Sequence, residues 1–527
     1  MAGNPVQTDL FATPTPLNLL TPTGELWLRL FSLQWQTAAR YWEGLGSYSS
    51  GFVTPLMNAA AIFARREQRK WIKSPRWDSF HDYLSLLSVN AELAARCMNG
   101  SLDAVVSFHG KRWPQWMDAW THGIDIDNGR GVEKLLRLSQ RQFALMDAAS
   151  RHFPEAIHDI RDEFGFHFED GGYRLISETD RFRLIQVLPN RRSVTVRNDA
   201  KPILIIPPSV LGPNIMAFLP AENRSFVHAF ANQGFPTFIR IAKSISMHPA
   251  VQTMTGEDDA SDTRTFCETI LKSHGRPATL CGYCQGGFMA MLTLLSGELD
   301  GLADALMTCV SPMDGSRSKD LVAFIHLLPE RFRNLGYAVK ELPNGNRVVD
   351  GGIMSWVYKL KSIEFEGPVT AFYRDLEMLD RFDPPEKGFS KSALAINHWL
   401  LYDQVDLPEA VTRLSFESYR RPVSDDGTLP VRLFGRQLNF KRIRDRKIPY
   451  LICYAEKDNL VDPSSALAPM DFIDVELSSY PRGHVAIATS NLDPGAGDGA
   501  YVCTNTGCAG PVEFQLRLDA ETAGRDQ

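Results

Sequence analysis

The stretch ATLCGYCQGGF, residues 278–288, constrains the fold more than any other part of this 527-residue chain. A short apolar run leads into the pattern G-x-C-x-G with Cys284 at its centre, and an apolar helical pattern follows. With serine at the centre, this pattern is the nucleophile elbow, a sharp turn from a strand into a helix. Bulky neighbours would clash in so tight a turn, so Gly282, Gly286 and Gly287 suit it. The stretch therefore predicts Cys284 at the tip of a strand–turn–helix unit.

Short apolar runs alternate with helical patterns on both sides of this elbow. PILIIPP (202–208), PTFIRIA (236–242) and ALMTCVSP (305–312) are typical of strands buried on both faces. The stretch 258–275 between two such runs has Asp and Ser near its start and Gly275 at its end, which indicates a capped helix. Upstream, 180–188 and 193–198 are predicted to pair as antiparallel strands. The alternation predicts an α/β fold with a parallel sheet, of the α/β-hydrolase type.

Changes in composition and in hydrophobic pattern divide the chain into four segments. Residues 1–20, rich in Pro and Thr, are expected to be disordered, and 21–170 are expected to form a helical N-terminal domain. A catalytic domain is expected over 171–490, with the alternation interrupted at about 315–440 by an insertion placed where a lid would lie. The Gly-rich tail, 491–527, is expected either to add an edge hairpin or to stay mobile.

Composition excludes several classes of protein. Apolar residues make up 44% and charged residues 22%, as in soluble globular proteins, and the net charge of −6 disfavours nucleic acid as a partner. The eight cysteines show no paired zinc layout, so no metal and no cofactor are expected. The N-terminus lacks a secretory signal, and prolines interrupt the uncharged stretch 202–221. We expect a cytoplasmic protein with no transmembrane segment.

A thiolate nucleophile needs a base, and the base needs an acid that orients it. In this fold the chain order is nucleophile, acid, histidine. Asp458 follows the apolar strand pattern LICYA, and His484 follows the next one, so the order Cys284, Asp458, His484 is the expected one. Asp462 is a rival acid, although it precedes a proline and also suits the start of a turn. Asp314 is a second rival and better suits a pocket wall or a helix cap.

An oxyanion hole requires two N–H groups beside the nucleophile. The backbone N–H of Gln285, the first residue of the helix after the elbow, is one expected donor. The loop after the strand 202–208 should supply the other, from Ser209 or Val210. The N-terminus of the helix after the elbow also favours a thiolate at Cys284.

At these motifs the chain resembles the polyhydroxyalkanoate synthases, α/β-hydrolase-fold enzymes with cysteine at the elbow. The resemblance runs from about 180 to 484 and includes RFRLIQVLP, PILIIPPSVLGPNIMAFLP, LCGYCQGG, YAEKDNLVDP and RGHV. It implies that Cys284 accepts the acyl group, His484 is the base and Asp458 is the third member. It also implies a hydroxyacyl-coenzyme A substrate, a polyester product, a granule surface and a homodimer as partners. VSPMDGSR and the insertion also resemble intracellular polyhydroxyalkanoate depolymerases.

The sequence therefore predicts an acyltransferase that passes 3-hydroxyacyl groups from coenzyme A thioesters through Cys284 to a growing polyester such as polyhydroxybutyrate. Asp458 would fix the imidazole tautomer or assist the incoming hydroxyl. The alternatives are a depolymerase or thioesterase with the same three residues, and a granule-associated or scaffold protein whose elbow is a relic.

Overall fold

The computed structural model describes residues 22–73, 79–123, 130–494 and 510–523. The chain divides into two compact units, each built from segments that are distant in sequence. The helical unit comprises Met1–Gly51, Cys97–Ala156 and Glu364–Phe389, and the sheet unit comprises Phe52–Arg96, Ile157–Ile363 and Ser390–Gln527. The N-terminal segment expected to be disordered, 1–20, lies outside the described residues.

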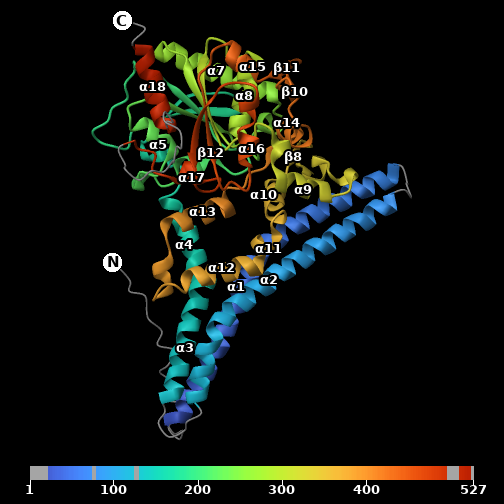
Figure 1. Ribbon diagram of the computed structural model, residues 1–527, viewed down its shortest axis with the longest axis vertical. Helices are drawn as coiled ribbons and strands as arrows, with labels where there is room; N and C mark the ends of the chain where they lie inside the picture. Colours follow the sequence, from blue (N-terminus) through green and yellow to red (C-terminus); the bar gives the residue numbers. More distant parts are fainter. Residues whose placement is uncertain (1–21, 74–78, 124–129, 495–509, 524–527) are drawn as a thin grey trace. The chain divides into compact units, whose positions relative to one another are not determined.

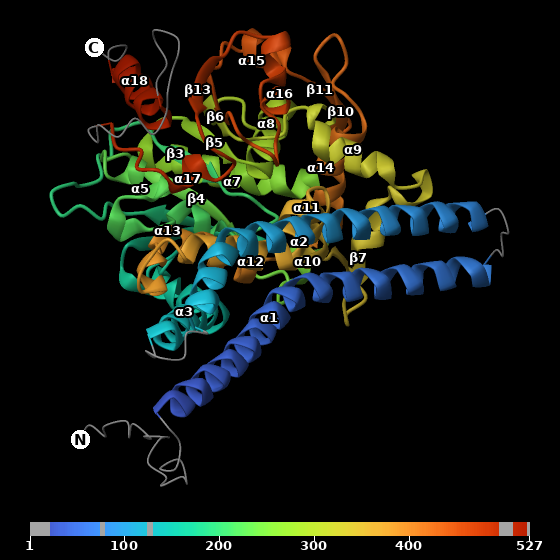
Figure 2. The ribbon, with the colours of Figure 1, turned by 60° about the horizontal axis from the view of Figure 1, so that its bottom comes forward.

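An eight-stranded sheet organises the sheet unit. Its spatial order is β1-β2-β4-β3-β5-β6-β12-β13; β1 and β2 are antiparallel to their neighbours, and the strands from β4 onward are parallel. The strands are β1 (Tyr173–Glu178), β2 (Phe182–Val187), β3 (Ile203–Ile206), β4 (Thr237–Ala242), β5 (Ala278–Tyr283), β6 (Ala303–Cys309), β12 (Tyr450–Ala455) and β13 (Glu476–Tyr480). Figure 2 shows β3, β5 and β6 side by side, as their hydrogen-bonded registers require. The order and the elbow after β5 make this an α/β-hydrolase fold, as predicted.

Helices cover both faces of the sheet (Figure 1). On one face α7 (Gly256–His274) and α8 (Gln285–Ser296) pack on β3 and β5, and their apolar side chains join those of the sheet in one buried core. On the other face lie α5 (Phe226–Ala231) and α18 (Pro511–Ala523). Thr255 and Asp258 form a capping box at the start of α7, and Gly275 ends it in the left-handed conformation.

The predicted insertion separates two strands that are neighbours in the sheet, β6 and β12. Its elements are α9 (Lys319–Leu327), β7 (Val339–Glu341), β8 (Arg347–Val349), α10 (Gly351–Leu360), α11 (Ile363–Glu366), α12 (Pro368–Leu379), α13 (Lys391–Tyr402), β9 (Leu407–Pro408), α14 (Glu409–Arg420), β10 (Thr428–Leu433), β11 (Arg436–Asn439) and α15 (Lys441–Asp445). Of these elements, α12 and all of α11 except Ile363 belong to the helical unit. The strands β6 and β12 therefore pair in parallel although this insertion separates them in the sequence.

The N-terminal region is helical, as predicted. It begins with α1 (Pro22–Lys73) and α2 (Ser79–Gly123), which each contribute to both units, and continues with α3 (Arg130–Asp147), a π-helical turn (Ala148–His152) and α4 (Phe153–Asp159). In the helical unit, Leu30, Ala119 and Leu135 bring α1, α2 and α3 together around a small apolar core. None of the helices in the described part of the chain combines the length and the apolar composition that crossing a bilayer requires.

Two local predictions differ from the structure. Residues 193–198 are not a strand: β2 pairs with β1 on one side and β4 on the other, so neither edge of β2 is free for them. In the tail, residues 511–523 form the helix α18, which differs from the two expected structures, an edge hairpin or a mobile segment. Val512, Phe514 and Leu518 of this helix are buried. The Asp519 carboxylate on α18 accepts the backbone N–H of Lys201 at 2.8 Å, which ties the helix to the start of β3.

Candidate active site

Cys284 lies at the tip of the elbow between β5 and α8. Its backbone has φ 52° and ψ −126°, a conformation that is strained for a residue with a side chain and typical of a nucleophile at this turn. The backbone N–H of Cys284 donates to the Cys309 carbonyl oxygen at 2.8 Å, so the neighbouring strand β6 holds the turn in place. Unlike Cys281, Cys309 and Cys453, which are buried, Cys284 is partly exposed. Cys284 is therefore the least buried of these four cysteines.

The glycines around Cys284 are required by close contacts within the elbow. A Cβ atom on Gly282 would lie 2.3 Å from Gly287 Cα. On Gly286 it would lie 2.3 Å from the Pro207 carbonyl oxygen, which belongs to the loop after β3. On Gly287 it would lie 2.0 Å from Ser311 Oγ. The strand, the helix and the two adjacent loops thus approach one another more closely than any side chain permits.

The sheet brings His484 and Asp458 together from separate loops. Asp458 follows β12 and His484 follows β13, and the two loops are joined by a hydrogen bond from the Lys457 N–H to the Arg482 carbonyl oxygen at 3.1 Å. His484 Nδ1 lies 2.7 Å from Asp458 Oδ2, and both side chains are buried. The other oxygen, Asp458 Oδ1, accepts the backbone N–H groups of Leu460 and Val461 at 2.8 and 3.0 Å. The carboxylate is therefore fixed, and it orients the imidazole.

His484 is electrostatically coupled to Cys284 as well as to Asp458. Burial alone would lower the pKa of His484, but the charges of Asp458 and Cys284, together with hydrogen bonds to both side chains, raise it well above the usual value. A raised pKa favours an imidazolium at neutral pH, which can give its proton to a leaving group. The arrangement can support nucleophilic attack by sulfur followed by proton transfer.

The two rival carboxylates have other partners. Asp462 caps the short helix α16 (Pro463–Ala466), and its Oδ1 accepts the Ser464 N–H at 2.9 Å. Asp314 is buried and caps a 3₁₀ turn through Ser316, while its second oxygen lies 3.1 Å from Arg317 Nε. Of the three carboxylates considered from the sequence, Asp458 is the one that the structure places against His484.

The expected oxyanion donors lie on the two segments that meet at the elbow. Gln285 is the first residue of α8, and its side-chain Nε2 donates to Ser415 Oγ at 2.8 Å, so the side chain is held by α14 of the insertion. Val210 lies in the loop after β3 and is partly buried against the apolar cluster that includes Leu335 and Ile353. This loop contacts the elbow at Gly286.

Two tyrosines of the insertion also lie in electrostatic range of Cys284, and no sequence motif pointed to either of them. Burial raises the pKa of Tyr358 on α10 and of Tyr419 on α14, and the charge of Cys284 raises both further. The Tyr419 ring packs closely over Gly315, where an added Cβ atom would lie 2.7 Å from the ring. The insertion therefore supplies two phenols near the candidate nucleophile.

A row of buried thiols lies in the sheet next to the elbow. Cys281 on β5, Cys309 on β6 and Cys453 on β12 come from consecutive neighbouring strands, and Cys309 is hydrogen-bonded to both of the others. Burial raises the pKa of Cys453 well above its usual value. These thiols are packed as small apolar side chains, in contrast to the accessible Cys284.

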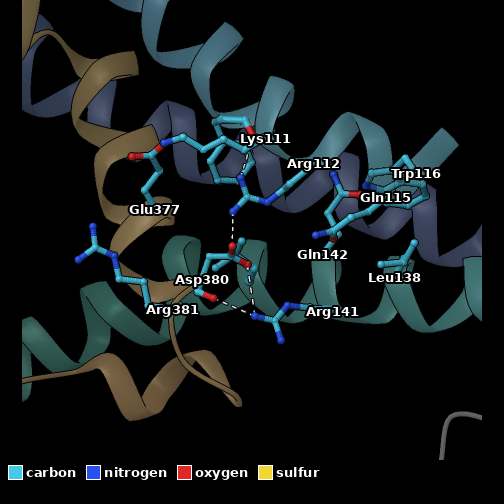
Figure 3. A pocket seen from close by; sticks show the side chains of 12 residues that line it. Lys111, Arg112, Gln115, Trp116, Leu138, Arg141, Gln142, Glu377, Asp380 and Arg381 are labelled. Atoms are coloured by element: carbon cyan, nitrogen blue, oxygen red, sulfur yellow. Dashed lines mark hydrogen bonds and ion pairs between the residues drawn. The ribbon is translucent and has the colours of Figure 1, made fainter. Parts of the chain in front are cut away.

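The helical unit holds a separate cavity of about 610 Å³ between α2, α3 and α12 (Figure 3). Arg112 and Arg141 converge there on Asp380, at 2.5 and 3.5 Å, and Lys111 pairs with Glu377 at 2.7 Å. These pairs connect the three helices. We assign the cavity a structural role and place the candidate active site at Cys284.

No protein family and no curated protein matches this sequence. Among solved structures, the chain is similar to a Rhodococcus esterase (12% identity, TM-score 0.33), with 67% of this chain and 98% of that chain covered. It is also similar to the thioesterase domain of the curacin biosynthetic pathway (10%, 0.32, covering 60% and 94%) and to a proline iminopeptidase of Mycobacterium smegmatis (13%, 0.32, covering 67% and 98%). The assignment of the fold rests on this chain's own strand order and elbow.

Proposed function

We propose that this protein is an acyltransferase of the polyhydroxyalkanoate synthase type, with Cys284 as the nucleophile. The observation that carries the proposal is the hydrogen-bonded arrangement of Cys284, His484 and Asp458, with a partly exposed thiol at the elbow and a buried histidine whose pKa is raised. The proposed donor is a 3-hydroxyacyl-coenzyme A thioester, and the proposed acceptor is the hydroxyl of another acyl unit or of the growing chain.

In the first step the Cys284 thiolate attacks the thioester carbonyl carbon. The new bond joins Cys284 Sγ to the acyl carbon, and the bond from that carbon to the sulfur of coenzyme A breaks. The His484 imidazolium gives its proton to the departing thiolate, so coenzyme A leaves as the thiol and the imidazole becomes neutral. The N–H groups of Gln285 and Val210 are the proposed donors to the carbonyl oxygen while it carries negative charge.

In the second step the neutral imidazole removes the proton from the acceptor hydroxyl. The hydroxyl oxygen attacks the acyl carbon, an oxygen ester forms, and the bond to Cys284 Sγ breaks. The thiolate and the imidazolium return to their starting states, and the polyester is one unit longer. Asp458 holds the imidazole in the tautomer that both steps require, since its Oδ2 faces Nδ1 and leaves Nε2 for the reaction.

A cysteine nucleophile suits this reaction because the first step exchanges one thioester for another. The acyl group therefore remains activated for the hydroxyl. Water would compete as an acceptor, and a site covered by the insertion, from which Tyr358 and Tyr419 approach Cys284, would limit that competition. The alternative function, hydrolysis by a depolymerase or thioesterase, uses the same three residues with water as the acceptor.

The test is mass spectrometry of the intact protein and its peptides after mixing with 3-hydroxybutyryl-coenzyme A. We expect a hydroxybutyryl increment on the peptide that contains Cys284, together with release of coenzyme A and insoluble polymer. Free hydroxy acid in amounts equal to the coenzyme A would instead identify a hydrolase. Cys284→Ala should abolish the increment, and Cys97→Ala is the matched control because Cys97 is also partly exposed. No increment on Cys284 would contradict both functions.

A further inference from the structure

A cavity of about 370 Å³ in the sheet unit lies between the second half of α1 and the hairpin β7–β8. Figure 2 shows β7 beside this part of α1. Among the described residues that line the cavity, one is acidic, Glu341, and seven are basic: Arg65, Arg66, Arg69, Lys70, Lys73, Lys340 and Arg347. The whole chain has a net charge of −6, so this concentration of cations is a local feature of the fold.

The basic residues converge from two segments that are distant in sequence. Five of them lie on one stretch of α1, residues 65–73, and recur at intervals of four residues, so they share one side of the helix. Like charges at this spacing repel each other on a helix. Lys340 on β7 and Arg347 on β8 add two cations from another wall. A basic helix side that is only solvated would not explain this second segment, so the convergence favours a bound anion.

A buried carboxylate, Glu67, fixes one wall of the cavity. Its Oε1 accepts the Tyr337 hydroxyl at 2.5 Å and pairs with Lys70 Nζ at 3.2 Å. Its Oε2 accepts the Tyr83 hydroxyl and pairs with Arg331 at 3.0 Å. The Lys70 ammonium also donates to the Tyr337 hydroxyl at 2.6 Å. Both oxygens of Glu67 are therefore engaged, and this carboxylate holds Lys70 in position.

Carboxylates outside the cavity hold the two cations of the hairpin. Lys340 pairs with Asp350 at 2.9 Å and with Asp406 at 2.8 Å. Arg347 pairs with Glu409 at 3.2 Å. None of these three carboxylates lines the cavity, so the protein positions both cations from the side that faces away from it.

Three other cations that line the cavity, Arg65, Arg66 and Lys73, have no carboxylate partner in the described part of the chain. The Arg66 guanidinium lies over the Tyr337 ring, with 4.6 Å from Cζ to the ring centroid. Its Nε is buried and has no hydrogen-bond acceptor among the described residues. A buried N–H group usually has a partner, and a charged one is costly to leave without one. An anion in the cavity would supply the acceptor that Arg66 lacks.

We propose that this cavity binds a small oligophosphate, a chain of two or three phosphate groups that is either free or part of a nucleotide. Such a chain carries several negative charges, which match the unpaired Arg65, Arg66 and Lys73. Arg69 is also available, because its contact with Glu341 at 3.4 Å is exposed and therefore weak. Arg65 and Lys73 lie about 12 Å apart along the helix, so a chain of phosphates suits the row better than one phosphate. The planar guanidinium fork matches phosphate oxygens in geometry.

The shape of the cavity favours a small ligand over a large polyanion. A volume of about 370 Å³ is usual for small-molecule pockets. The lining also has an apolar part, because Ile62 on α1 and Val339 on β7 pack on the buried cluster of Leu335 and Ile353. A bilayer or a nucleic acid duplex would instead need basic side chains on an outward face that a large partner can reach. The binding does not depend on the proposed acyl transfer.

The test is isothermal titration calorimetry of the full-length protein with inorganic tripolyphosphate at about 50 mM salt, where charges are weakly screened. We expect a Kd on the order of 10 μM. Arg65→Gln combined with Lys73→Gln should weaken binding at least about tenfold, since two unpaired charges are lost. The matched control is Arg192→Gln combined with Lys272→Gln, which removes two exposed basic residues outside the cavity and leaves the same net charge. The control should bind like the wild type.

Thermal unfolding checks that both double variants are folded. Without ligand their midpoints should equal that of the wild type, because all four positions are exposed. With tripolyphosphate, the wild type and the control should gain stability, and the Arg65/Lys73 variant should gain less.

Two further ligands identify the anion. ATP without Mg²⁺ separates the two sources: binding tighter than that of tripolyphosphate assigns the site to a nucleotide, and equal or weaker binding assigns it to the phosphate chain alone. Butanetetracarboxylate, a polyanion without phosphate, should bind at least about tenfold more weakly than tripolyphosphate, since each phosphate offers three strong acceptor oxygens.

Four results would overturn the proposal. The first is no binding of tripolyphosphate, and the second is equal binding of the tetracarboxylate. The third is an equal loss of affinity in the two double variants. The fourth is association with anionic lipid vesicles or duplex DNA in place of tripolyphosphate.

Discussion

The Tyr283 hydroxyl donates a hydrogen bond to the backbone carbonyl oxygen of His484 at 2.7 Å. Tyr283 immediately precedes Cys284 on β5, and its ring lies edge-on to the imidazole with 6.1 Å between centroids. One buried side chain therefore connects the strand that carries the candidate nucleophile to the loop that carries the candidate base. The spacing between the two reactive groups depends on this link as well as on the Asp458 carboxylate.

Tyr283→Phe removes this link and leaves the ring in place. We expect a loss of about 1–3 kcal/mol in the free energy of unfolding, because the carbonyl loses a buried donor, and a roughly tenfold fall in kcat from the less precise position of His484. Tyr450→Phe is the control, since that buried hydroxyl lies 2.9 Å from Thr308 Oγ1 and away from His484. Denaturant titration and steady-state kinetics measure both. An equal fall in kcat for the two variants would contradict the positioning role.

Asp458→Asn keeps the size of the side chain and removes its charge. The pKa of His484 should fall, since Asp458 is one cause of its elevation, and the amide should favour the wrong tautomer. We expect kcat to drop by a factor of roughly 10²–10⁴. Asp462→Asn is the control, because an asparagine at that position can still cap α16. Substantial activity in the Asp458 variant alongside loss in the Asp462 variant would reverse the assignment.

The raised pKa of His484 has a consequence for stability. Because the folded-state pKa lies above the unfolded value of about 6.5, the imidazolium stabilises the fold fully below that pH. The stabilisation is lost as the pH rises through the folded-state pKa. The wild type should therefore lose stability relative to His484→Gln above about pH 6.5, by up to about 1.4 kcal/mol per pH unit. Denaturant titrations of both proteins from acid to alkaline pH measure this difference in the free energy of unfolding. If the wild type instead gains stability over the variant as the pH rises, the histidine is held neutral in the folded state.

Gly286→Ala tests the close approach of the elbow to the loop after β3. The added Cβ atom would lie 2.3 Å from one backbone carbonyl oxygen and 2.5 Å from another, and neither can move aside cheaply. We expect at least about 3 kcal/mol of destabilisation, and little folded protein. Gly110→Ala in α2 is the control, with nothing within 4 Å of the new atom, and it should stabilise by about 0.5–1 kcal/mol. The midpoints of thermal unfolding report both, and a fully folded Gly286→Ala enzyme would contradict the packing described.

The sequence predicted the elbow and the loop positions of Asp458 and His484 because these depend on local patterns. A nucleophile between glycines and a polar residue after a buried strand are both visible in a short window, and the sheet then brings the strand ends together. Residues 193–198 have a strand-like composition, but a strand pairs only with a sheet edge that is free. The edge of β2 on which they could pair is occupied by β1. No local pattern carries that information.

Tyr358 and Tyr419 could not have been identified from the sequence for a related reason. They lie within electrostatic range of Cys284 on α10 and α14, whose positions depend on how the whole insertion folds. The helix at 511–523 follows a Gly-rich stretch, and the burial of its apolar residues, such as Phe514, depends on tertiary packing. Contacts of this kind depend on tertiary packing.

The buried thiols of Cys281, Cys309 and Cys453 can report whether the sheet opens. In the native protein a water-soluble alkylating reagent has access to Cys284 and Cys97 among the six cysteines that the structure describes, whereas the three strand thiols become available only when neighbouring strands part. Identifying the labelled peptides over time would thus separate modification of Cys284 from opening of the sheet in one sample.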